Sequence, residues 1–197
     1  MPETGLPPYC AYCAGLPAAH PDRIYHDRRY GFPPPKGEAG ESWLFGLLLL
    51  EINQAGLGWS MMLRKEENFR RAYVGFSIDA VAAFGETDRL RLLADSGIIR
   101  NRRKVDAAIE NARRLQAQRP GYGSFQGWLD AHQPRSLDAW ITLFRATLVF
   151  TGPEIVNEFL MSSGYLDGAH GPACPVRVQA IAAGPAWTRS AAAPAGV

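Results

Sequence analysis

The chain has 197 residues, of which 47% are hydrophobic and 20% are charged, and its formal net charge is +2. These values are typical of a globular protein with one domain and a sizeable core, and a charge this small does not by itself indicate a nucleic-acid partner. The longest uncharged apolar run, residues 43–50, is far shorter than the roughly 20 residues that span a bilayer. No secretion signal opens the chain, so we expect a cytoplasmic protein with no membrane partner.

The hydrophobic spacing predicts an all-α fold. Residues 1–40 are rich in Pro, Gly and Ala without a sustained period, and we expect extended loops there. From residue 41 to residue 163 the pattern is helical almost throughout, and no strand pattern appears. Residues 175–197, which are rich in Ala and Pro, are expected to be loosely ordered. This leaves one helical domain over residues 1–174, and the predicted helices cover residues 41–54, 65–73, 87–96, 101–119, 125–131, 137–148 and 153–163.

Local signals set several of these boundaries. Thr87 and Asn101 can cap the helices that follow them, and Ser136 precedes another. Pro153 occupies a first-turn position, where its missing N–H costs nothing. Gly164 is a typical stop signal for the last of these helices.

A single carboxylate interrupts the apolar run of the helix predicted over residues 41–54. Glu51 follows four leucines, and Trp59 comes eight residues later. A carboxylate is rarely buried unless it is paired or hydrogen-bonded, because removing the ion from water costs several kcal/mol. Glu51 therefore marks either the edge of a helix or a pocket.

The cysteines and nearby histidines suggest a metal site. Three cysteines are too few for a secreted disulfide framework. Cys10, Cys13 and His26 lie near one end of the chain, whereas His170 and Cys174 lie near the other. Two thiolates and two imidazoles would make a structural zinc site that ties residues 8–40 to the C-terminal region. The spacing is not that of a zinc finger, so these residues can also be incidental.

Four aromatic residues are candidates for a ligand pocket. Tyr12, Tyr25, Tyr30 and Trp59 could surround a flat, electron-poor ligand, and each aromatic face attracts a cation by about 0.5–2 kcal/mol. The alternative is that each simply packs at the edge of the domain. Glu51 supports the interpretation as a ligand pocket only if its side chain lies beside these rings.

Two segments could contact phosphate. Arg100, Arg102 and Lys104 cluster where a helix is predicted to begin, and Gly152 lies in a short turn between two predicted helices. Backbone N–H groups at a helix start can hold a phosphate without reading sequence. The alternatives are a solvated basic face and a plain connection.

Taken in order, these motifs resemble those of the DNA-3-methyladenine glycosylase I family, which belongs to the helix-hairpin-helix glycosylase superfamily. The resemblance runs from about residue 10 to residue 174. The segments that carry it are Cys10–Cys13, Tyr25–Pro33, Leu50–Trp59, Glu67–Phe69, Ser96–Arg100, His132–Pro134, Phe150–Gly152, and His170 with Cys174.

The resemblance implies the helix-hairpin-helix glycosylase fold with a zinc site, and it assigns roles to individual residues. Glu51 would be the catalytic carboxylate that recognises the base. Tyr25 and Trp59 would be stacking walls, while Tyr12 and Tyr30 stand where the family has Trp.

Zinc would be held by His26, His170, Cys174 and one N-terminal cysteine. The Cys-x-aromatic-Cys pattern favours Cys10, whereas the family's spacing back from His26 favours Cys13. We prefer Cys10, because a three-residue loop insertion costs little free energy.

The implied activity is hydrolysis of the N-glycosidic bond of 3-methyladenine in alkylated double-stranded DNA by a monomer, which leaves an abasic site. Arg100, Arg102, Lys104 and Gly152 would contact DNA. The hairpin departs from the family pattern, since Pro153 and Glu154 replace a polar pair there. Two alternatives follow: a DNA-lesion-binding protein without catalysis, and a glycosylase for another alkylated base.

Overall fold

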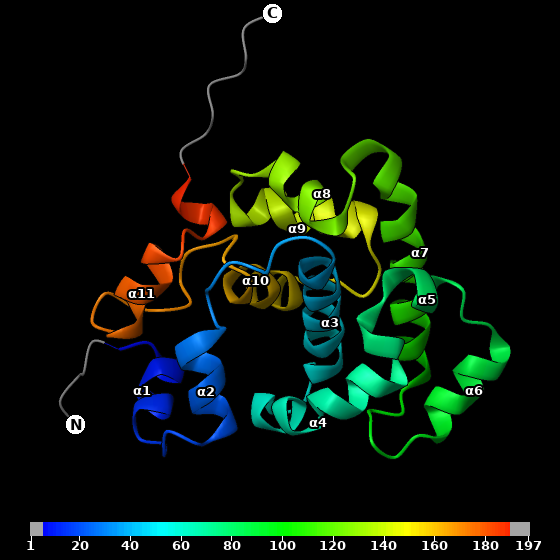
Figure 1. The fold of residues 1–197 in the computed structure, drawn as a ribbon, viewed down its shortest axis with the longest axis horizontal. Coiled ribbons are helices and arrows are strands. Elements are labelled where there is room, and N and C mark those ends of the chain that lie inside the picture. Colours follow the sequence, from blue (N-terminus) through cyan, green and yellow to red (C-terminus); the bar gives the residue numbers. More distant parts are fainter. Residues whose placement is uncertain (1–5, 190–197) are drawn as a thin grey trace, which may run out of the picture.

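The computed structural model describes residues 6–189, and within that range it contains helices and connecting loops but no strands (Figure 1). The prediction of an all-α fold is thus confirmed. The α-helices are α1 (Pro8–Ala14), α2 (Pro21–Arg28), α3 (Glu38–Gln54), α4 (Trp59–Ala72), α5 (Ile78–Ala82), α6 (Glu86–Ala94), α7 (Arg102–Tyr122), α8 (Phe125–His132), α9 (Leu137–Thr147), α10 (Pro153–Ser162) and α11 (Val176–Ala182). Two short 3₁₀ helices are η1 (Val74–Phe76) and η2 (Ala186–Thr188).

Helix α3 forms the centre of the molecule, with other helices packed around it (Figure 1). Every residue from Leu44 to Asn53 is buried, as expected for a helix that is apolar on all sides. It packs against α4, α7, α8 and α10. A Cβ at Gly46 would lie 2.4 Å from the ring of Phe76, so glycine permits the close approach of η1. Glu51 therefore lies inside the core and not at a helix edge.

Helix α7 flanks this core, and α5, α6 and α8 pack against it. The side chain of Asn101 caps its first turn by accepting the N–H of Lys104 at 3.3 Å, as the sequence predicted. The predicted end before Pro120 is wrong, because the helix continues to Tyr122. Its last turn is held by an ion pair between Arg119 and Glu41 at 2.9 Å.

The N-terminal segment forms helices where extended loops were expected. α1 and α2 each begin with a proline at the first helical position, which fits a helix start. The Nδ1 atom of His20 accepts the N–H of Asp22 at 3.3 Å and caps α2. The two helices pack against each other, and α2 also packs against α4. These helices are too short for a hydrophobic period to identify them.

The C-terminal segment also differs from the expectation of loose order. Residues 175–189 form α11 and η2, whereas residues 190–197 lie outside the described part of the chain. Arg177 pairs with Asp167 at 2.8 Å, and its guanidinium lies 5.3 Å from the centre of the Trp187 ring. The N–H of Trp187 donates to the carbonyl of Gly164 at 3.2 Å. α11 consequently lies on the same side of the molecule as α1 and α2 (Figure 1).

The other boundaries agree with the sequence or shift by less than two turns. α4 starts at Trp59, six residues before the predicted position. α6 starts after Gly85 and not Thr87, because the N–H of Gly85 is satisfied by Asp88 at 3.3 Å.

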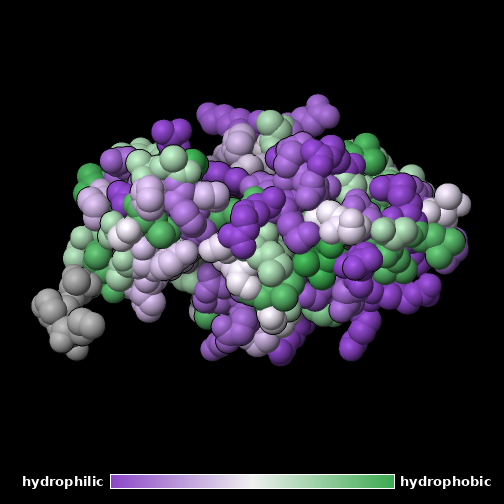
Figure 2. Space-filling view, turned by 90° about the horizontal axis from the view of Figure 1, so that it is seen from below, coloured by the Kyte–Doolittle hydropathy of each residue, from purple (hydrophilic) through white to green (hydrophobic). Residues whose placement is uncertain are grey.

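On the face shown in Figure 2, hydrophilic and hydrophobic side chains are interspersed. Among the helices of residues 6–189, none is both long enough and apolar enough to cross a membrane.

Candidate active site and metal centre

Four buried side chains from opposite ends of the chain meet in one group: Cys10, His26, His170 and Cys174. Their ligand atoms all lie within 4.8 Å of one another. The Nδ1 atom of His170 is 3.8 Å from the sulfur of Cys10 and 3.5 Å from that of Cys174. The Nε2 atom of His26 is 3.7 Å from the sulfur of Cys174. The group thus joins α1 and α2 to the segment that precedes α11.

The geometry fits a tetrahedral metal ion. Bonds of about 2.3 Å to sulfur and 2.0 Å to nitrogen would place the ligand atoms ~3.3–3.8 Å apart, and the three separations above fall in that range. The second nitrogen of each imidazole also has a partner. His26 Nδ1 lies 2.7 Å from Asp27 Oδ1, and His170 Nε2 lies 2.7 Å from the carbonyl oxygen of Tyr30. Such partners orient histidine ligands.

A cavity of about 540 Å³ lies between α1, α2, α3 and α10, next to this group. Four aromatic side chains line it, namely Tyr9, Tyr25, Tyr30 and Trp59. Three carboxylates also line it, namely Glu51, Glu154 and Glu158. None of the described lining residues is a lysine or an arginine. The cavity is therefore aromatic and acidic, which suits a flat cationic ligand.

Glu51 is a buried carboxyl in the wall of this cavity, with only 3% of its surface exposed. The hydroxyl of Ser162 donates to its Oε1 at 3.3 Å. Burial, together with the neighbouring charge of Glu158, raises the pKa of Glu51 to about 8, although the Ser162 hydrogen bond acts in the opposite direction. A carboxyl held in this way is an acceptor that a cation can draw into its ionised form.

The aromatic rings form a connected wall. The centre of the Tyr25 ring lies 5.2 Å from that of Trp59 and 5.8 Å from that of Tyr30. Tyr9 continues the wall, 5.4 Å from Tyr30. The Tyr25 hydroxyl and the Trp59 indole nitrogen are buried without a hydrogen-bond partner among the described residues. Buried polar atoms of this kind usually have partners, so these two are free to bind a polar ligand.

The metal-binding group and the cavity share backbone. Tyr25 directly precedes His26, and the Tyr30 carbonyl contacts His170. Ala169, which directly precedes His170, also lines the cavity. A metal ion held by this group would therefore fix the position of the aromatic wall.

A tight turn connects α9 to α10. Gly152 is the N-cap of α10, and Phe150 has a positive φ of 60°, which is uncommon for a residue other than glycine. The side chain of Asn111, on α7, forms two hydrogen bonds with the backbone of this turn. Its side-chain amide donates to the carbonyl of Val149 at 3.0 Å, and its side-chain oxygen accepts the N–H of Val149 at 2.8 Å.

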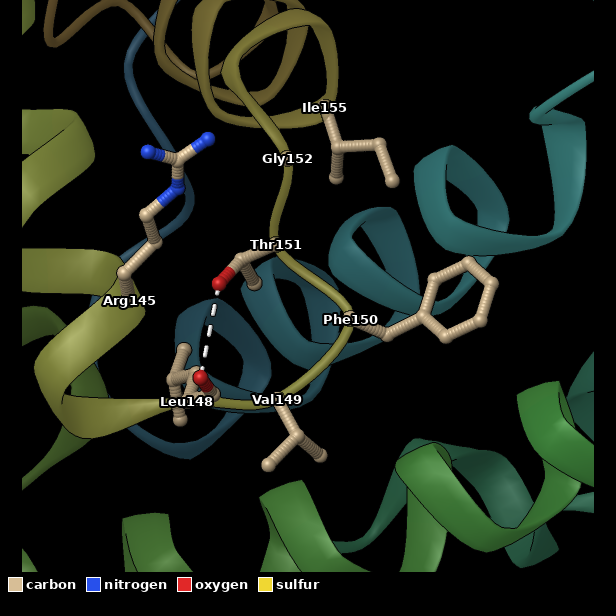
Figure 3. A pocket seen from close by; sticks show the side chains of 7 residues that line it. All are labelled: Arg145, Leu148, Val149, Phe150, Thr151, Gly152 and Ile155. Atoms are coloured by element: carbon tan, nitrogen blue, oxygen red, sulfur yellow. Dashed lines mark hydrogen bonds between the residues drawn. The ribbon is translucent and has the colours of Figure 1, made fainter.

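The turn borders an open hollow of about 510 Å³ (Figure 3). Thr151 is buried, and its hydroxyl donates to the carbonyl of Leu148 at 3.4 Å. In the view of Figure 3, Arg145 lies on one side of the turn, whereas Phe150 and Ile155 lie on the other. An exposed cation beside the N-terminus of a helix is an arrangement that can hold a phosphate.

Comparison with known proteins identifies the family. A family model described as methyladenine glycosylase matches residues 18–141. The chain belongs to this family. It is 41% identical over 144 residues to DNA-3-methyladenine glycosylase 1 of Escherichia coli (strain K12), a match that covers 72% of this chain and 74% of that protein. It is 28% identical over 172 residues to DNA-3-methyladenine glycosylase of Haemophilus influenzae, covering 78% and 90%.

Solved structures of such glycosylases share the fold. One of them is the 3-methyladenine DNA glycosylase I of Staphylococcus aureus, solved to explain 3-methyladenine recognition. It superimposes with a TM-score of 0.73 at 28% identity, covering 85% of this chain and 95% of that one. A single-residue variant of 3-methyladenine DNA glycosylase I, solved in complex with 3-methyladenine, superimposes with a TM-score of 0.71 at 27% identity, covering 85% of this chain and 96% of that one. The resemblance to the glycosylase family that was inferred from the motifs is thus confirmed.

The structure brings most of the residues named from the sequence of this glycosylase to the expected places, but it separates two of them. Cys13 lies outside the metal-binding group, and its thiol donates to the carbonyl of Asp22 at 3.6 Å. Tyr12 is 48% exposed and stacks on the outer side of Tyr9, with ring centres 6.2 Å apart. Tyr9 takes the place in the wall that was expected of Tyr12, and only its spacing of three residues from Tyr12 on one helix could have indicated this.

The basic cluster is also divided. Arg100 and Arg102 are exposed, and Arg102 lies 3.9 Å from Glu86. Lys104 is buried, and its ammonium donates to the carbonyls of Asn53 at 2.8 Å and Ala55 at 3.0 Å. The expected contact of Lys104 with DNA therefore does not fit its position, because its charge caps the end of α3. Arg145, which the sequence reasoning missed, is the cation beside the turn.

Proposed function

We propose that this protein is a monofunctional DNA glycosylase that hydrolyses the N-glycosidic bond of 3-methyladenine in alkylated double-stranded DNA and leaves an abasic site. Membership of the methyladenine glycosylase family supports this function. The structural observation that carries the proposal is a buried carboxyl, Glu51, in an aromatic cavity with no lysine or arginine among the described lining residues. Such a cavity favours a positively charged base over a neutral one.

The chemistry of the lesion explains why this cavity suffices. Methylation at N3 gives the base a positive charge and weakens its bond to the sugar, so the base leaves as a neutral molecule and needs little acid catalysis. The nucleotide must leave the base stack to reach the cavity. The aromatic wall would then hold the cationic base, and Glu51 would accept a hydrogen bond from its edge. A nearby positive charge favours the ionised carboxylate, which offsets the effect of burial on its pKa.

The absence of lysine among the described lining residues also supports a single chemical step at the sugar. Without an amine nucleophile in the cavity no Schiff base forms, so we propose that water attacks the sugar and that no strand cleavage follows. The Tyr25 hydroxyl and the Trp59 indole N–H, which have no partner, are proposed to bind polar atoms of the flipped nucleotide.

We propose that the metal is zinc and that its role is structural. Cys10, His26, His170 and Cys174 would hold it, since two thiolates and two neutral imidazoles form a closed tetrahedral set with no open position for substrate. When bound, zinc supplies a rigid link between the N-terminal helices and the C-terminal segment. Cys10 is preferred to Cys13 as the N-terminal ligand, because Cys10 lies in this group and Cys13 does not.

We propose that α9, α10 and their connection form the hairpin that gives the superfamily its name and that this hairpin contacts the DNA backbone. Gly152 offers the start of α10, and the exposed side chains of Arg145, Arg100 and Arg102 supply positive charge. Such contacts position a protein on duplex DNA without reading its sequence. We further propose that the protein acts in the cytoplasm as a monomer, which light scattering coupled to size-exclusion chromatography would test.

The decisive experiment measures free base released from methylated duplex DNA, resolved by chromatography. We expect the wild-type protein to release 3-methyladenine and Glu51→Gln to be slower by at least ~100-fold, because the neutral amide cannot stabilise the cationic base. Glu110→Gln is the matched control, since it removes a half-buried carboxylate of α7 that does not line the cavity. Equal rates in wild-type and Glu51→Gln proteins would refute the assigned role of Glu51.

One observation favours an alternative in which the protein binds lesions without releasing them. Glu154 lies in the first turn of α10, close to the proposed phosphate contact at Gly152, where a carboxylate repels phosphate. Duplex affinity without base release from a folded, metal-loaded protein would support this alternative. Release of a different methylated base in the same assay would instead indicate a glycosylase with another lesion range, since Tyr30 changes the shape of the cavity.

A further inference from the structure

One face of α10 brings a second carboxylate to the base cavity. Glu154, Glu158, Met161 and Ser162 are spaced by four, three and one residues, so they lie on one side of the helix, and all four line the cavity. Glu51 faces them from α3, linked to α10 by its hydrogen bond with Ser162. Glu158 is half-buried, whereas Glu154 is exposed.

The charge of Glu158 is not neutralised by a basic side chain in the described structure. No ion pair joins it to a lysine or an arginine among residues 6–189, and none of the described residues around the cavity is basic. Burial, together with the charge of Glu154, raises the pKa of the Glu158 carboxyl, and the neighbouring Tyr30 offsets only part of this rise. The guanidinium of Arg29 lies 5.3 Å from the centre of the Tyr25 ring, but Glu66 holds it through two hydrogen bonds of 2.7 Å.

We propose that Glu158 is a specificity-determining residue, which together with Glu51 makes the cavity a two-carboxylate site selective for positively charged purines. This inference rests on the proposed function. Two carboxylates in one cavity without a cation repel each other, and a cationic base between them relieves that repulsion. A neutral base gains nothing from it. The site would therefore hold the charged nucleotide before bond cleavage and would release the neutral base afterwards.

The test compares two ligands that differ in charge. The probes are the 3,9-dimethyladenine cation, which is permanently charged because both N3 and N9 are alkylated, and free neutral 3-methyladenine in the same mildly alkaline buffer. Their affinities are measured by isothermal titration calorimetry. We expect Glu158→Gln to weaken binding of the cation by about ten-fold, as loss of one partly screened charge predicts, and to change binding of the neutral base by less than about two-fold.

Asp138→Asn is the matched control, because it removes an exposed carboxylate at the start of α9, away from the cavity. It should leave both affinities unchanged. Retained binding of neutral 3-methyladenine by Glu158→Gln shows that the cavity is still folded. If the variant loses affinity equally for both ligands, or for neither, the inference is wrong.

A kinetic measurement separates this inference from the proposed function. On methylated duplex DNA, Glu158→Gln should raise KM for release of 3-methyladenine several-fold and change kcat less, because the residue acts on binding of the charged base. If the wild-type protein releases no base, the proposed function fails. If the wild-type protein is active and Glu158→Gln has an unchanged KM, only the role of Glu158 fails.

Discussion

Glu51 combines a cost in stability with the catalytic role that we propose for it. A carboxyl that is 3% exposed and has no cationic partner disfavours its own ionised form. Hydrophobic packing elsewhere in α3, from Leu44 to Leu50, keeps this side chain in place. A protein without the proposed activity would gain stability from a nonpolar residue at this position.

This cost predicts a pH dependence of stability. The pKa of Glu51 is raised from its ordinary value of 4.5 to about 8. Between these values the folded protein holds a proton that the unfolded chain has lost, so the free energy of unfolding falls as the pH rises, by at most ~1.4 kcal/mol for each unit of pKa shift. Below 4.5 both states hold the proton, and this contribution no longer changes.

Urea unfolding of the wild-type and Glu51→Gln proteins across this pH range checks the prediction. The variant should lose less stability than the wild type between weakly acidic and weakly alkaline buffer, because glutamine does not titrate. The two curves should converge at the acidic end. Parallel curves over the whole range would show that Glu51 ionises in the folded protein as easily as in the unfolded chain.

At the scale of single elements, the junction of α3 and α7 depends on Lys104. Carbonyls at the end of α3 have no N–H partner within the helix. The buried ammonium of Lys104, at the start of α7, donates hydrogen bonds to two of them. Burial lowers the pKa of this ammonium. Its hydrogen bonds to two carbonyls favour the charged form. A residue that looks like part of a basic DNA-binding cluster in the sequence thus has a structural task.

Lys104→Met should therefore destabilise the protein by about 1–3 kcal/mol, since it leaves buried carbonyls without a donor. The salt dependence of DNA binding should stay the same. Arg102→Ala is the comparison, because loss of one phosphate contact would reduce the slope of log affinity against log salt by ~0.9 without a similar loss of stability. Thermal unfolding and salt titrations of duplex binding measure both effects. A reduced salt slope in Lys104→Met would instead show that Lys104 contacts DNA.

How far the sequence predicts the structure can be judged from these elements. Long helices with a clear period, such as those containing Glu51 and Val105, were found with nearly correct ends. α1, α2 and α11 were missed because they are short and lie in segments rich in Pro, Gly and Ala without a sustained hydrophobic period, and no local pattern encodes their packing against other elements. The motif placed Glu51, Tyr25 and Trp59 at one cavity. It could not show that Tyr9 replaces Tyr12 or that Lys104 is buried, because both depend on the direction of a side chain.

At the scale of the whole molecule, the Cys/His group connects parts of the chain that have little core of their own. α1 and α11 meet in a small cluster of buried apolar residues near Cys10 and Cys174, and α2 contributes Tyr25 to a second small cluster. Three of the four aromatic wall residues belong to this part, while Glu51 belongs to the central core. The cavity is therefore built between a large hydrophobic unit and a smaller one that contains the Cys/His group.

Removal of the metal should consequently loosen the smaller unit and the cavity together. If zinc is bound as proposed, we expect chelation to lower the melting temperature by several degrees, to expose residues 8–40 to protease, and to weaken binding of 3-methyladenine. Cys10→Ser should reproduce these effects, whereas Cys13→Ser should retain the metal, because its thiol lies outside the group. Metal content by mass spectrometry distinguishes the two variants. Loss of metal in Cys13→Ser and its retention in Cys10→Ser would reverse the ligand assignment.

The hydrogen bonds between Asn111 and Val149 affect the entropy change that the proposed binding to duplex DNA would involve. Two hydrogen bonds from a long core helix hold the α9–α10 turn in its final shape before any DNA is present. If the turn contacts DNA as proposed, association loses little conformational entropy there, since the turn is already ordered. The hairpin can engage and leave successive stretches of backbone as a rigid body, which suits a protein that must sample many undamaged nucleotides for each lesion that it meets.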